Sequence, residues 1–86
     1  MSDLDDRDAE FYDQVDEFIN FANERVPSWG TPRVSAVLLF AASRFNAHNY
    51  FATDGSPANR EAMVEFYREQ YTKMLLDNLD WLADTD

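Results

Sequence analysis

The hydrophobic positions of the chain fall into three segments of helical length. Two short breaks separate them, residues 26–32 (VPSWGTP) and residues 53–57 (TDGSP), and these breaks hold both glycines of the sequence. No run of strand length alternates apolar and polar residues beside a hairpin turn, so the pattern predicts an all-α fold.

Each break also supplies the start of the next helix. Thr31-Pro32 and Ser56-Pro57 both place a hydroxyl at the N-cap position and a proline at the first helical position, where its missing N–H costs nothing. The chain is expected to form one domain, with a flexible acidic lead-in before the first helix. The predicted limits are residues 1–86 for the domain, 1–7 for the lead-in, and about 8–26, 33–52 and 57–83 for the helices.

The first predicted helix has the pattern of an ordinary amphipathic helix. Its apolar residues fall on one face at about 100° per residue, and its acidic residues take the other, which predicts a single buried stripe. The stripe consists of Phe11, Val15, Phe18, Ile19, Ala22 and Val26.

The middle segment is apolar on two opposite faces, which is typical of a buried helix. The first face holds Val34, Leu38, Ala41 and Phe45, and the second holds Ala36, Leu39, Phe40, Ala47, Tyr50 and Phe51. The third segment carries an apolar arc wider than half its circumference. Since a small three-helix monomer cannot cover this much apolar surface, we expect a three-helix bundle completed by homo-oligomerisation. The predicted homodimer interface uses the second face of the middle helix and the broad face of the third.

Charge excludes several classes of partner. The 86 residues include 17 Asp and Glu against 7 Lys and Arg, a net charge of -10, which repels phosphate backbones, so we expect no nucleic-acid partner. A basic protein is the kind of second partner that such a surface would suit. The sequence has no apolar run long enough to span a membrane, and the acidic start lacks the basic and apolar regions of a signal peptide, so we expect a cytoplasmic protein with no membrane partner.

The sequence shows no motif for metal, cofactor or phosphate chemistry. The only histidine, His48, has Phe45 and Phe51 three residues to either side, so the Glu-x-x-His pairs of di-iron bundles are missing. With no cysteine either, we predict no catalytic, cofactor-binding or metal-binding residue. The members of a Ser–His–Asp triad need only meet in space, so enzyme activity stays open, although the sequence favours a protein without catalysis.

Five residues stand out as candidate polar or interface positions. Arg44 borders the second face of the middle helix, where a guanidinium would either pair with an acid or carbonyl, or form an anion pocket with Asn46 and His48. Trp29 and Trp81 are either exposed anchors for a partner or, for Trp29, a cap on one end of the bundle. We therefore expect a non-catalytic interaction or regulatory module; the alternative is a ligand-binding or enzymatic bundle around Arg44.

Several short segments of the chain have a characteristic combination of residues and spacing. The most distinctive is Arg44-Phe45-Asn46-Ala47 after an alanine-rich turn, and the others are Phe11-Tyr12, Phe18-Ile19, Ala22-Asn23, Val34-Ser35-Ala36, Tyr71, Lys73-Met74-Leu75 and Asn78-Leu79. Together these segments resemble a family of small bacterial proteins of unknown function. The resemblance implies a bacterial, helical domain and brings no assigned activity, substrate or cofactor.

Overall fold

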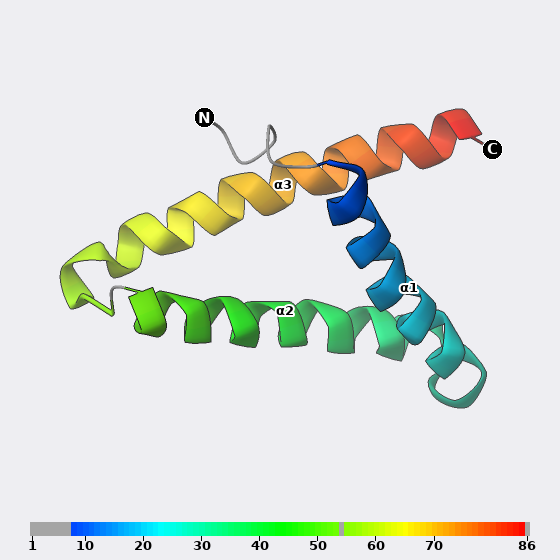
Figure 1. Cartoon of the computed structure of the whole chain (residues 1–86), viewed down its shortest axis with the longest axis horizontal. Helices are drawn as coiled ribbons and strands as arrows, with labels where there is room; N and C mark the ends of the chain where they lie inside the picture. The colour runs from blue at the N-terminus through cyan, green and yellow to red at the C-terminus, as the bar shows by residue number, and fades with distance from the viewer. Residues whose placement is uncertain (1–7, 54, 86) are drawn as a thin grey trace. The chain divides into compact units, whose positions relative to one another are not determined.

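A computed structural model describes residues 8–53 and 55–85 and shows an all-α fold (Figure 1). In these ranges the chain forms three long helices, one short 3-10 turn and no strand, which confirms the predicted fold class. The elements are α1 (Ala9–Trp29), α2 (Thr31–Thr53), η2 (Pro57–Asn59) and α3 (Arg60–Thr85). The chain divides into two compact units, one ending at Phe45 and the other beginning at Asn46.

Helix α1 begins close to the predicted residue because Asp8 caps it. The Asp8 side chain accepts a hydrogen bond of 2.9 Å from the backbone N–H of Phe11, which lies in the first turn, where N–H groups have no carbonyl partner within the helix. The predicted lead-in, residues 1–7, lies outside the described part of the chain.

The predicted end of the first helix near Val26 is wrong, because α1 continues through Pro27 to Trp29. Proline removes the hydrogen bond to the carbonyl four residues earlier and usually interrupts a helix. Here the helix still closes beyond the proline, since the Gly30 N–H donates to the Val26 carbonyl at 2.8 Å and holds the last turn together.

Gly30 is the single residue between α1 and α2. Its N–H closes α1, while its carbonyl accepts a 3.1 Å hydrogen bond from the N–H of Val34 and so opens α2. Thr31 is therefore already helical, two residues earlier than the predicted start. Because both helices share Gly30, the chain changes direction without a loop.

The second unit is organised around the buried side chain of Tyr50. Its hydroxyl donates a hydrogen bond to the carbonyl of Ser56, and its own carbonyl accepts one of 2.9 Å from the N–H of Gly55. Ser56 and Pro57 occupy the predicted cap and first helical positions, but the Ser56 side chain makes no capping bond, and one 3-10 turn precedes α3. These bonds fix the end of α2 to the start of the next element.

Few side chains are buried within the described ranges. The buried apolar residues are Ala22, Val34 and Tyr50. The first-helix stripe was expected to be buried, and this prediction is wrong for most of its members, since Phe11, Val15, Phe18 and Ile19 are exposed. A helix stripe is buried only where a neighbouring element covers it, and in the first unit close packing is confined to Ala22 and Val34, near the Gly30 corner.

Candidate interaction site

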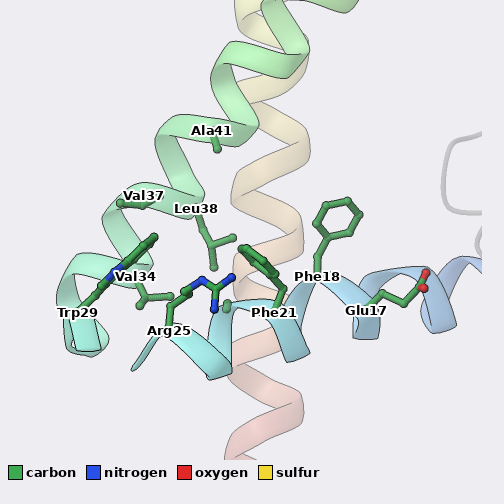
Figure 2. Close-up of a pocket in the computed structure, with 10 residues that line it drawn as sticks. Glu17, Phe18, Phe21, Arg25, Trp29, Val34, Val37, Leu38 and Ala41 are labelled. Carbon is green, nitrogen blue, oxygen red and sulfur yellow. The ribbon is translucent and has the colours of Figure 1, made fainter. Parts of the chain in front are cut away.

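The first unit contains an apolar groove between α1 and α2. Its volume is about 550 Å³, and Ala22 and Val34, the buried residues beside the Gly30 corner, are among its lining residues. Figure 2 shows the side chains of Phe21 on α1 and Leu38 on α2 pointing toward each other inside the groove. The other lining residues are Glu17, Phe18, Arg25, Trp29, Val37 and Ala41.

The groove is apolar because eight of its ten lining residues have apolar side chains, Glu17 and Arg25 being the exceptions. Its cation, Arg25, is half-buried, and its guanidinium lies 4.2 Å from the centre of the Phe21 ring. A guanidinium over an aromatic face is attracted by the negative charge of the ring face and needs no carboxylate there. The groove can therefore take apolar side chains, with Glu17 at the end away from Trp29 (Figure 2).

The two tryptophans lie in different settings. Trp29 lines the groove at the end of α1 and remains 44% exposed, so its ring is close to the corner without being enclosed. Trp81 lies in the last turns of α3 and is 63% exposed. The structure does not bring the two residues into one described unit, and their role as partner anchors remains a prediction.

Arg44 is exposed on α2, and its partner is an aromatic ring. The guanidinium carbon lies 4.8 Å from the centre of the Phe40 ring, one helical turn earlier. Phe40 itself is 60% exposed, so the cation and the ring form one open patch on the surface of α2.

The three residues of the predicted anion pocket do not share one side of α2. His48 is exposed four residues after Arg44 and lies on the same side, whereas half-buried Asn46 is rotated by about 200° from Arg44. One helix therefore cannot direct all three polar groups at one anion.

The sequence pattern did not identify Phe21 and Arg25, which both line the groove. Both lie outside the six-residue stripe predicted for the first helix, but they are four residues apart and hence neighbours on its surface. The available signal was this arginine–aromatic spacing near the proline-containing break, the same spacing that pairs Phe40 with Arg44.

The described residues show neither a metal-binding cluster nor a membrane-spanning helix. Within residues 8–53 and 55–85, no three histidine, aspartate or glutamate side chains gather where they could hold a metal ion. In the same ranges, no helix combines the length and apolar character needed to cross a bilayer.

Comparison with known proteins identifies a family but no better-characterised relative. No curated protein and no solved structure matches the chain significantly. A family model described as "Protein of unknown function (DUF3144)" matches residues 11–82, which include nearly all of α1 and the whole of α2. The chain therefore belongs to the DUF3144 family of proteins of unknown function.

Proposed function

We propose that this protein is a non-catalytic protein–protein interaction module that acts as a homo-oligomer, with a homodimer as its basic form. The observation that carries the proposal is the exposure of large apolar side chains on all three helices, among them Phe18 at 73% and Phe51 at 71%. Apolar surface on this scale, where few of the described residues are buried, is typical of proteins that complete their core by association.

The second helix and the broad apolar face of α3 form the interface in this proposal. Helix α2 contains no Asp or Glu, although the chain as a whole has a net charge of -10. Two copies that meet through α2 therefore avoid bringing carboxylates together at the centre of the contact.

The acidic side chains of α1 and α3 then remain available to another protein. Because they repel anions and attract cations, the second partner suited to them is a basic protein surface. The proposed module thus has one surface that binds a second copy of the chain and another that binds a basic partner. We propose that it works in the cytoplasm.

Light scattering during size-exclusion chromatography tests the homo-oligomer directly. We expect a mass twice the 10.0 kDa of the chain, maintained at two protein concentrations and at low and moderate salt. A mass of one chain under all four conditions would contradict the proposal and leave the apolar surface to a different partner.

A further inference from the structure

One face of α2 carries a continuous seam of side chains at heptad spacing. The residues are separated alternately by four and three positions, the spacing that keeps a row on one side of a helix and forms the core of a coiled coil. The α2 seam consists of Arg33, Val37, Phe40, Arg44, Ala47 and Phe51. All six lie on one helix, so helical geometry alone places them on a common face.

Most of the α2 seam is uncovered. Its two phenylalanines are 60% and 71% exposed, Val37 is 42% exposed, and both arginines are exposed, while Ala47 is half-buried. The seam therefore presents its two large rings and its two cations outward from the same helix face.

The chemistry of the α2 seam repeats in the order cation, small aliphatic, aromatic. Arg33, Val37 and Phe40 form the first repeat, and the remaining three residues form the second. Consider the α2 helices of two copies packed antiparallel, with the two-fold axis passing midway between Phe40 and Arg44. Every arginine of one seam then faces a phenylalanine of the other. The facing pairs are Arg33 with Phe51, Val37 with Ala47, and Phe40 with Arg44, each formed twice by symmetry.

A parallel arrangement of the same two helices lacks this complementarity. Equivalent positions of parallel coiled coils face each other, so Arg44 would face Arg44 and Phe40 would face Phe40. Two guanidinium groups in contact repel, whereas a guanidinium on an aromatic face is attracted, more strongly when water is excluded. Within one chain, the guanidinium carbon of Arg44 lies 4.8 Å from the centre of the Phe40 ring, so this face already brings these two side-chain types together.

We infer that the α2 seam is the docking surface for a second copy of this chain, and that two copies pair through it as antiparallel helices related by a two-fold axis. The inference rests on the proposed homo-oligomer and specifies its interface. It also gives Arg44 a role, which is to cover the Phe40 ring of the partner copy.

Exchanging the two central side chains tests the pairing. Phe40→Arg places an arginine opposite Arg44 of the other copy, and we expect the dissociation constant of the dimer to rise at least tenfold. The double exchange Phe40→Arg with Arg44→Phe restores an arginine–phenylalanine pair and should return the dimer toward its original affinity. Ala42→Arg is the matched control, because its exposed position lies about 180° from the centre of the seam and should leave the dimer intact.

Engineered cysteines test the direction of pairing, since the sequence has none of its own. In an oxidised mixture of a Val37→Cys chain and an Ala47→Cys chain, we expect a disulfide between the two different chains and little between identical ones. A mixture of Ser35→Cys and Asn49→Cys chains, changed on the opposite side of α2, should not cross-link. Circular dichroism confirms that each variant remains helical.

The possible outcomes separate this inference from the proposed function. A dimer that tolerates Phe40→Arg, or that cross-links Val37→Cys chains to each other, overturns the antiparallel seam but leaves the homo-oligomer intact. If Phe40→Arg unfolds the chain, the cross-linking of the cysteine variants alone tests whether the helices pair antiparallel. An unaltered protein that is monomeric at every concentration overturns both.

Discussion

Gly30 adopts a backbone conformation that other residues enter only with strain. Its φ of 86° and ψ of 148° lie close to a region occupied almost solely by glycine. A Cβ atom at this position would meet nothing within 4 Å. The requirement for glycine therefore comes from the backbone and not from crowding.

Replacing Gly30 with alanine should lower the free energy of unfolding by about 1–3 kcal/mol, the usual cost of holding a residue in a strained backbone region. Chemical denaturation monitored by circular dichroism measures the change. Asn23→Ala provides the control, because it adds alanine at an exposed position inside α1 and should have little effect. Equal stability of the Gly30→Ala variant and the unaltered protein would show that the corner can relax.

Helix boundaries show what local sequence rules can and cannot predict. The Asp8 start of α1 and the proline at the start of η2 follow from residue preferences at helix ends, and both agree with the structure. The continuation of α1 through Pro27 does not follow from such rules, because it depends on the specific hydrogen bond from Gly30 to Val26.

The cap on α1 should make a measurable contribution. We expect Asp8→Ala to lower the free energy of unfolding by about 1 kcal/mol, because the capping bond between the Asp8 carboxylate and the N–H of Phe11 is lost. Asp16→Ala removes the same charge from a site beyond the first turn, where the helix dipole has little influence, and should cost less. If the two variants lose the same stability in urea titrations, the Asp8 contribution is one of charge and not of capping.

At the scale of the element, the apolar pattern also identified the faces of α2 but not their neighbours. The prediction that α2 is apolar on opposite sides holds, since Leu38 lines the groove while Phe40 lies on the α2 seam. The groove itself was not predictable from periodicity, because it depends on the one-residue corner that brings Phe21 and Leu38 together (Figure 2). Periodicity shows which residues share a face of one helix, whereas a site between two helices requires their geometry.

For the whole molecule, the excess of negative charge opposes both folding and association. With a net charge of -10, carboxylates that are close along α1, such as Asp13, Asp16 and Glu17, repel one another. At about 0.1 M salt, interactions beyond about 10 Å are largely screened. The folded state should therefore be less stable in low salt than its apolar contacts alone would allow.

Raising sodium chloride from about 10 mM to about 150 mM should raise the melting temperature. If screening contributes about 1 kcal/mol, the shift for a chain of this size is on the order of 4–8 °C. Differential scanning calorimetry measures it, and the variant Asp13→Asn with Asp16→Asn should respond less because it has less charge to screen. A melting temperature that is the same at both salt concentrations would mean that repulsion among carboxylates is negligible.

The one-residue junction between α1 and α2 also constrains how the length of this protein can change. Adding a single residue to the first turn of α2, between Gly30 and Val34, would rotate every later residue of α2 by about 100° relative to the start of that helix. Such an insertion would turn Val34 and Leu38 away from Phe21 and so disrupt the groove. Apart from Gly30 itself, changes of residue identity near the corner should therefore be tolerated during evolution more readily than insertions or deletions, and the number of residues between the two helices should remain fixed in functional relatives.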